Sequence, residues 1–124
     1  MSKVRVVFYQ SKDGEVPVLE WLEQLPRKVQ DKCTVKIERL SELGHELRRP
    51  EADLLRDKIY ELRIGYQGAN YRILYFFHGK LAVVLAHGLM KEREVPPKEI
   101  DRAVERRNQF EKDPEGHTFT EDER

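Results

Sequence analysis

The chain has 124 residues, of which 39% are hydrophobic and 37% are charged, and its formal net charge is zero. This length fits a single domain with one modest core. The sequence has no apolar run near the ~20 residues that a membrane span needs and no apolar signal-peptide region at its start, so we expect a cytoplasmic protein without a membrane partner. Its single cysteine, Cys33, excludes an internal disulfide, and no His/Cys cluster near it supports a metal site.

The charges are unevenly placed along this neutral chain. Residues 111–124 hold six acids and two bases, so residues 1–110 carry a net charge of +4. Six bases and three acids lie between residues 57 and 93. Although the neutral total argues weakly against a nucleic-acid partner, a local basic region is the usual electrostatic footprint of one.

The first part of the chain predicts one strand and two helices. Residues 4–9 are β-branched and aromatic, which is typical of a strand. Pro17 suits the first turn of a short helix over residues 18–24. Apolar residues then recur at helical spacing over residues 27–43, and Gly44 supplies a stop. Residues 45–57 carry a proline and no clear period, so we expect a connecting loop there, with room for a helical turn.

The second part of the chain predicts three consecutive strands and a helix. The apolar runs over residues 58–64, 70–77 and 81–88 are separated by turn-prone residues, which predicts antiparallel hairpins. A helix is expected over residues 98–112. The sequence therefore predicts an α+β fold in the order β-α-α-β-β-β-α, with an antiparallel sheet and the N-terminal helices on one face. We expect one domain over residues 1–112 and an acidic, disordered tail over residues 113–124.

Alternation along the strands predicts which side chains share a face of the sheet. Residues 70–77 are largely apolar on both faces, which indicates a central strand. The side chains expected to face the N-terminal helices are Tyr60, Leu62, Ile64, Tyr71, Ile73, Tyr75 and Phe77. Those expected on the opposite face are Ile59, Glu61, Arg63, Arg72, Leu74 and Phe76.

Arg63 and Arg72 lie in the middle of apolar strands, where an unpaired guanidinium costs folding free energy. Antiparallel pairing can bring both groups to one concavity, with Lys91 arriving from the end of the last strand. Such a site suits a phosphodiester, because guanidinium groups bind phosphate in a bidentate manner. Tyr71 or His87 could then stack on a base or move a proton.

An alternative interpretation needs no ligand. Each arginine could instead pair with a neighbouring acid, such as Glu61 or Glu92, on a solvated face of the sheet. The residue pattern alone favours this interpretation over a phosphate site.

Several segments follow one another in an order and spacing that resemble a known family. They are the opening FYQSKDGEVPVLEWLEQL, the run LxxxIYELRI, the strand YRILYFF, and an apolar strand ending HGLMK that leads to PPKEIDRA. Together they resemble the RelE/ParE toxin superfamily, most closely its HigB-like, phage-derived Gp49-like branch, over roughly residues 4–112.

The resemblance implies the toxin of a type II toxin–antitoxin pair, with a helix-turn-helix antitoxin, the ribosome and mRNA as partners. The HigB and RelE branches cleave mRNA in the ribosomal A site without a metal or cofactor, by attack of the 2′-hydroxyl on the phosphate. By position, Arg72 matches the family's catalytic arginine, Arg63 a basic residue in the preceding strand, and Lys91 the cation after the last strand. The resemblance thus implies that all three are catalytic, with Arg72 and Lys91 binding and neutralising the scissile phosphate. We assign the neighbouring bases Lys58 and Arg93 to RNA binding.

Two acidic residues depart from the family pattern. Glu92 follows Lys91 where the HigB-like branch has a second cation, and Glu61 stands where RelE has a lysine. Glu61 could act as a base or could neutralise Arg63. Two alternatives to an RNA endonuclease therefore stay open: a ParE-like topoisomerase inhibitor, and a catalytically weak relic that binds its antitoxin and acts in autoregulation.

Overall fold

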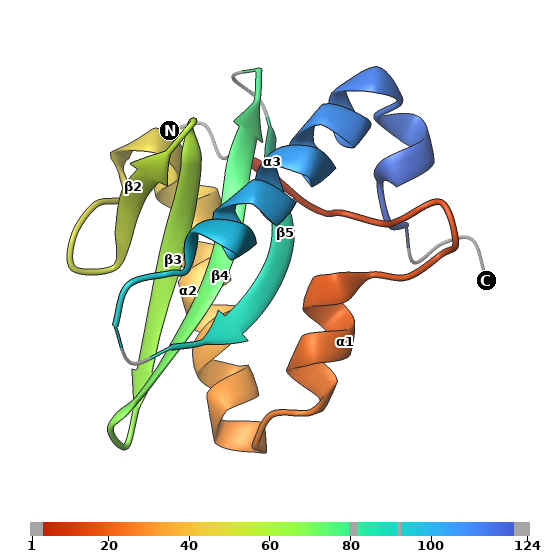
Figure 1. Ribbon diagram of the computed structural model, residues 1–124. Helices are drawn as coiled ribbons and strands as arrows, with labels where there is room; N and C mark the ends of the chain where they lie inside the picture. The colour runs from red at the N-terminus through yellow and green to blue at the C-terminus, as the bar shows by residue number, and fades with distance from the viewer. Residues whose placement is uncertain (1–3, 80–81, 92, 121–124) are drawn as a thin grey trace.

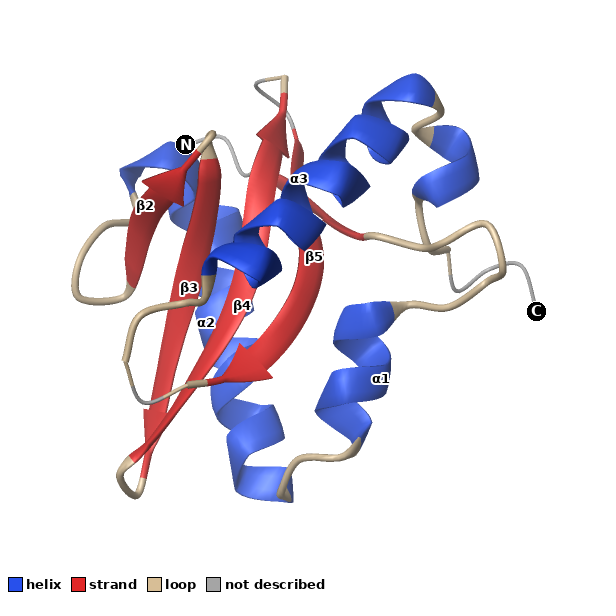
Figure 2. Ribbon diagram, in the orientation of Figure 1, coloured by secondary structure: helices blue, strands red, loops and turns tan. Residues whose placement is uncertain are grey.

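A mixed sheet between two layers of helices forms the fold, which is described by a computed structural model over residues 4–79, 82–91 and 93–120. Helices α1 and α2 cover one face of the sheet, and α3 crosses the other (Figures 1 and 2). The elements are β1 (Arg5–Phe8), α1 (Pro17–Glu23), α2 (Arg27–Leu43), β2 (Ala52–Arg56), β3 (Ile59–Tyr66), β4 (Ala69–His78), β5 (Ala82–Met90) and α3 (Pro97–Lys112), with short 3-10 turns η1 (Gly44–Glu46) and η2 (Glu115–His117).

The helices lie where the sequence predicts them. Helix α2 has the predicted bounds, while α1 and α3 each begin one residue earlier, at a proline. Gly44 ends α2 with a φ of +54°, and a Cβ there would lie 2.6 Å from the Val4 side chain. Both the backbone conformation and the lack of space therefore require glycine at this position.

The prediction of a loop over residues 45–57 was wrong in part, because residues 52–56 form strand β2. This strand pairs antiparallel with β3 through a tight turn in which Asp57 and Lys58 have φ values of +53° and +63°. Such turns usually carry Asn or Gly at those positions, and ADLLR has no β-branched residue. Neither local signal of a hairpin is present in the sequence, so only the pairing with β3 reveals the strand.

The sheet has the order β1-β5-β4-β3-β2, which makes β4 the central strand as predicted. The three hairpin-connected strands β3, β4 and β5 are antiparallel, which confirms that prediction. Strand β1 lies parallel to β5, so the sheet is mixed, whereas the sequence predicts an antiparallel sheet. Local periodicity specifies a strand but says nothing about its partner, which is why the parallel pair was not predicted.

Two apolar clusters fill the two sides of the sheet, and they confirm the predicted faces of β3 and β4. Leu62, Ile64, Ile73 and Tyr75 belong to the cluster under α1 and α2, whereas Leu74 and Phe76 lie under α3. Leu74 and Phe76 are therefore covered by the chain's own C-terminal helix.

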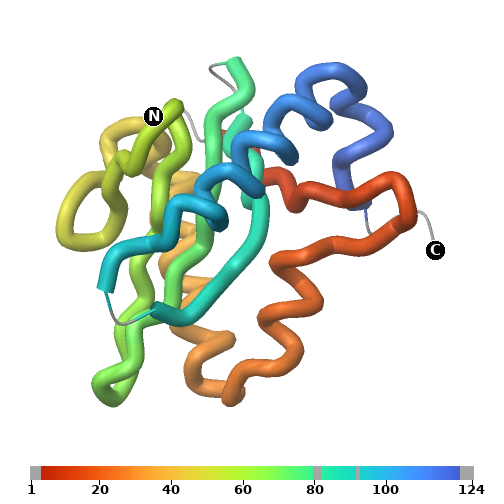
Figure 3. Tube along the Cα trace, in the orientation of Figure 1, coloured from red at the N-terminus to blue at the C-terminus, as the bar shows by residue number. Residues whose placement is uncertain are grey.

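The prediction of a disordered tail was wrong for residues 113–120. His117 is 2% exposed, its Nδ1 atom lies 2.8 Å from the carbonyl oxygen of Gln10, and its ring stacks on Tyr9. Thr118 forms a bridge with Tyr9, so this segment runs beside the chain that leaves β1 (Figure 3). The prediction rested on the acidic composition of this segment. It could not show that His117 is buried against residues near the start of the chain. Residues 121–124 of the predicted tail lie outside the described residues.

Candidate functional site

Arg63 of β3 and Arg72 of β4 lie directly opposite each other in the antiparallel register. Both side chains lie on the α3 face, since Ile59 and Leu74 of the same strands pack under that helix. The residues expected to bring two guanidinium groups together therefore do so. Their position follows from the two-residue hairpin turn at Gln67 and Gly68, which sets the pairing register.

The two arginines line an open hollow of about 710 Å³ beside the start of α3. Its floor comes from β2, β3 and β4, and its rim from the segment before α3. The charged residues that line it are Arg56, Arg63, Arg72 and Arg93 together with Asp53, Glu61 and Glu94. The hollow thus carries four cationic and three anionic side chains.

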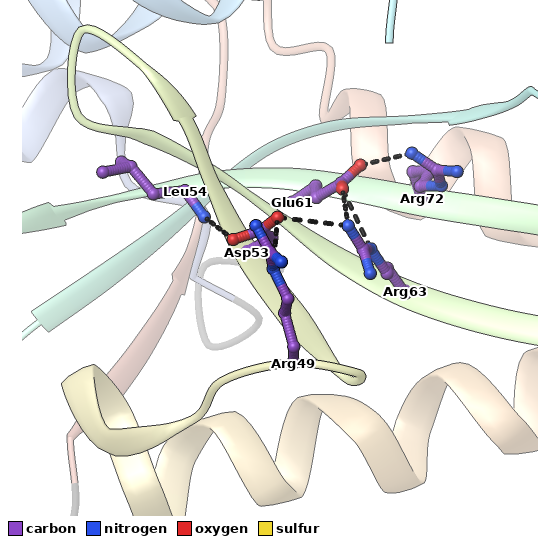
Figure 4. A network of polar contacts seen from close by, with 6 residues as sticks. All are labelled: Arg49, Asp53, Leu54, Glu61, Arg63 and Arg72. Carbon is purple, nitrogen blue, oxygen red and sulfur yellow. Dashed lines mark hydrogen bonds and ion pairs between the residues drawn. The ribbon is translucent and has the colours of Figure 1, made fainter. Parts of the chain in front are cut away.

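A buried carboxylate joins the two arginines. Glu61 is 2% exposed, and its Oε1 atom accepts a hydrogen bond from Arg72 Nη1 at 2.5 Å. Its Oε2 atom lies 2.9 Å from Arg63 Nε and 2.8 Å from Arg63 Nη2 (Figure 4). Each carboxylate oxygen therefore serves one guanidinium. The alternative of arginines paired with a neighbouring acid is thus realised at Glu61, whereas Glu92 lies outside the described residues.

A second carboxylate extends this network toward the edge of the sheet. Asp53 of β2 lies 3.3 Å from Arg63 Nη2 and 3.0 Å from Arg49 Nε. It also accepts a hydrogen bond from the backbone N–H of Leu54 (Figure 4). Sequence reasoning missed both Asp53 and Arg49, because it assigned them to a loop. Arg63 is 35% exposed and Arg72 only 13%, so Arg63 is the guanidinium with more contact to solvent.

Lys91 lines a different hollow, of about 740 Å³, formed by the β3–β4 turn and the end of β5. Its backbone N–H donates to the carbonyl oxygen of Asn70 at 3.0 Å. Arg93 and Glu94 line both hollows, so the two are neighbours. The structure thus brings Arg63 and Arg72 together with Arg93, and it places Lys91 next to this group instead of within it.

Two other candidates, Tyr71 and Lys58, lie apart from the arginine pair. Tyr71 is on the opposite face of the sheet, edge-on against Trp21. Lys58 lies in the turn between β2 and β3 and lines another hollow, with Tyr60 and Phe77. The structure does not bring either residue to the arginine hollow. The position of Tyr71 on the opposite face could have been predicted, since adjacent residues of a strand, such as Tyr71 and Arg72, point to opposite faces of the sheet.

His87 is on the same face as the arginines but is covered by α3. It is 5% exposed, and its Nε2 atom lies 3.1 Å from Glu99 Oε1. Burial lowers the pKa of His87 to about 4, and the nearby Arg106 acts in the same direction. His87 is therefore neutral near pH 7, and it is not one of the residues that line the hollow.

Two further properties concern the whole described chain. Over residues 4–79, 82–91 and 93–120, no group of three or more His, Cys, Asp or Glu side chains is arranged to hold a metal ion. None of the helices in this part is long and apolar enough to cross a membrane.

A five-stranded sheet with N-terminal helices on one face and a C-terminal helix on the other defines a protein with a RelE-like fold. The chain matches the family model "Phage derived protein Gp49-like" over residues 20–108, and it belongs to this family. The family is of the RelE toxin type, and membership suggests a toxin with an antitoxin partner. A search of curated proteins found no match.

Proposed function

We propose that this chain is the toxin of a type II toxin–antitoxin pair, of the HigB-like branch, and that it is a ribosome-dependent mRNA endonuclease. The observation that carries the proposal is the pairing of Arg63 with Arg72 in an open hollow that also receives Arg93. Guanidinium groups held side by side on a sheet offer several N–H donors in fixed directions to one phosphodiester. Lys91 in the adjoining hollow extends the cationic surface along the RNA strand.

The proposed reaction is attack of a ribose 2′-hydroxyl on the adjacent phosphorus, which forms a 2′,3′-cyclic phosphate and breaks the bond to the 5′-oxygen of the next nucleotide. The 5′-oxygen leaves with a proton taken from water. Negative charge grows on the phosphate oxygens during this step, and Arg72 with Arg63 stabilises it. The hydroxyl proton must go to a base. Glu61 is held by both arginines, whereas Glu94 forms no ion pair within the described part of the chain. Glu94 is therefore our candidate for the proton acceptor.

The proposed partners follow from this activity. The toxin would act on mRNA in the A site of a cytoplasmic ribosome and be held inactive by a helix-turn-helix antitoxin. Lys58 and Arg93 are proposed as RNA contacts outside the reacting phosphate, since both are exposed cations near the sheet.

The test is expression of the chain without its antitoxin, followed by sequencing of cellular mRNA 5′ ends. We expect growth arrest and cuts within translated codons. Arg72→Ala should reduce cleavage at least about 100-fold, as is usual when one group that stabilises transition-state charge is removed. Lys91→Ala should reduce cleavage less, because Lys91 lies in the adjoining hollow and contacts the RNA strand there. Lys28→Ala is the matched control, because Lys28 is an exposed cation on α2, on the opposite face of the sheet. Cuts that persist in Arg72→Ala would contradict the assignment.

One observation favours the alternatives. Glu61 neutralises the arginine pair from within the sheet, which weakens any phosphate site there. Growth arrest with DNA damage and intact mRNA would contradict the endonuclease proposal and would favour a ParE-like topoisomerase inhibitor. Absence of toxicity would instead favour a relic whose role is to bind its antitoxin in autoregulation.

A further inference from the structure

The carboxylate of Glu61 makes the same kind of contact with both arginines that a phosphate between them would make. It lies on β3 between the two guanidinium groups, and its two oxygens accept hydrogen bonds from Arg72 Nη1 and from Arg63 Nε (Figure 4). A phosphate bound by the same arginines would use two of its oxygens in the same way. The carboxylate is 2% exposed, so it is held in this position by the packing of the sheet.

The arrangement has an electrostatic reason. Two like charges directly opposite each other on neighbouring strands destabilise a sheet. Arg63 and Arg72 are such a pair, and Glu61 offsets the repulsion from within hydrogen-bond distance of both. Asp53 supplies a second negative charge to Arg63 alone, at 3.3 Å. The two guanidinium groups and two carboxylates thus have no net charge in the free protein.

We propose that Glu61 is a built-in counter-anion that occupies the hydrogen-bond donors of the arginine pair. An RNA phosphate then binds to the pair only by drawing a guanidinium away from this carboxylate. The inference rests on the proposed function, because it takes the arginine pair as the phosphate-binding part of the site. Glu61 is accordingly a positioning residue that limits RNA affinity in the free protein. Arg63 is the guanidinium that turns outward, since it is the more exposed of the two.

The experiment measures binding of a short fluorescent RNA that is fully 2′-O-methylated, which keeps the phosphates and cannot be cleaved by 2′-hydroxyl attack. Glu61→Gln keeps the shape and one acceptor oxygen but removes the charge. We expect this variant to bind about 10-fold more tightly than wild type, because one charge interaction within the site no longer competes. The salt dependence should steepen by about 0.7 in log–log slope for each additional phosphate engaged.

Glu38→Gln is the matched control. Glu38 is an exposed acid on α2, on the other face of the sheet, so its replacement makes the same change in net charge away from the hollow. Its affinity should stay close to that of wild type. An equal gain in RNA affinity in Glu38→Gln and Glu61→Gln would overturn the proposal, because the gain would then come from the change in net charge and not from the arginine pair.

Arg72→Ala separates this inference from the proposed function. If Arg72→Ala binds the RNA more weakly while Glu61→Gln matches wild type, the arginine pair binds phosphate and the counter-anion role of Glu61 is wrong. If Arg72→Ala also matches wild type, the pair is not the phosphate site, and the proposed function falls together with the inference.

A second measurement does not depend on the folding of a variant. In wild-type protein carrying ¹³C-labelled glutamate and ¹⁵N-labelled arginine, titration with inorganic phosphate should shift the carboxyl resonance of Glu61 together with the guanidinium resonances of Arg63. Arginine signals that respond to phosphate while the Glu61 signal stays unchanged would overturn the proposal.

Discussion

At the scale of single residues, His87 is a buried imidazole that the proposed reaction does not use. Its Nε2 atom meets Glu99, and its Nδ1 atom has no hydrogen-bond partner within the described residues. Arg106 and Arg102 lie close enough on α3 to disfavour a positive charge on the ring, whereas Glu99 favours one. Burial dominates, so protonation of His87 opposes the packing of α3 on the sheet.

This predicts a loss of stability in mild acid. The pKa of His87 falls from 6.5 to about 4 on folding, so the unfolded chain binds a proton more readily than the folded chain between these values. Above pH 6.5 the titration of His87 leaves the free energy of unfolding unchanged. As the pH falls from 6.5 toward 4, it lowers the free energy of unfolding by on the order of 3 kcal/mol. Urea unfolding from pH 7 to pH 4 should therefore show a flatter profile for His87→Gln than for wild type.

The exposed His45 provides the control for that experiment. His45→Gln removes an imidazole that stacks on Phe77, on the other face of the sheet. An acid profile of His87→Gln that runs parallel to those of wild type and His45→Gln would show that His87 does not couple folding to pH.

At the scale of elements, the contact between α1 and β5 depends on one glycine. Gly88 of β5 lies against Trp21 of α1, and a Cβ built at Gly88 would lie 2.2–2.6 Å from atoms of the indole ring. Trp21 in turn packs edge-on against Tyr71, which restricts movement of the indole ring toward that side chain. The absence of a side chain at Gly88 therefore lets α1 approach the sheet.

We predict that Gly88→Ala lowers the free energy of unfolding by about 1–3 kcal/mol, since the extra methyl group overpacks this contact. Gly65→Ala is the matched control, because Gly65 also lies in a strand and a Cβ there meets nothing within 4 Å. That variant should stay within about 0.5 kcal/mol of wild type. Chemical denaturation of the two variants measures the difference, and equal stabilities would contradict the described α1 contact.

At the scale of the whole molecule, the segment after α3 joins the two ends of the chain. The backbone N–H of Gln10 donates to the carbonyl oxygen of His117, and that of Phe119 donates to the carbonyl oxygen of Phe8. Strand β1 is an edge of the sheet, and these bonds cover part of its open side. The returning segment therefore stabilises both the edge strand and the position of α3.

His117→Ala tests this closure. Its ring stacks on Tyr9 with a centroid distance of 5.3 Å and bonds the Gln10 carbonyl, so its loss leaves a cavity and an unpaired acceptor. We expect a loss of about 2 kcal/mol in the free energy of unfolding. Thr120→Ala, at an exposed position of the same segment, should change stability by less than about 0.5 kcal/mol. A tail without a structural role would make the two variants alike.

Much of the fold could be predicted because its signals are local. The proline at the start of α1 and of α3, and Gly44 after α2, mark helix ends through backbone conformation alone. Alternation in β3 and β4 likewise placed both arginines on one face, where the register now pairs them. Strand β2 escaped prediction because its pairing depends on β3 and leaves little trace in its own residues.

The amino-acid sequence by itself determined the helices, the faces of the hairpin strands and the cations that one face carries. The tertiary structure alone decided that Glu61 is shared by two arginines, that Lys91 lies in the adjoining hollow, and that the tail returns to β1. The physical reason is the range of the interactions: periodicity and turn preference act between near neighbours, whereas charge pairing and edge closure depend on which distant segments meet.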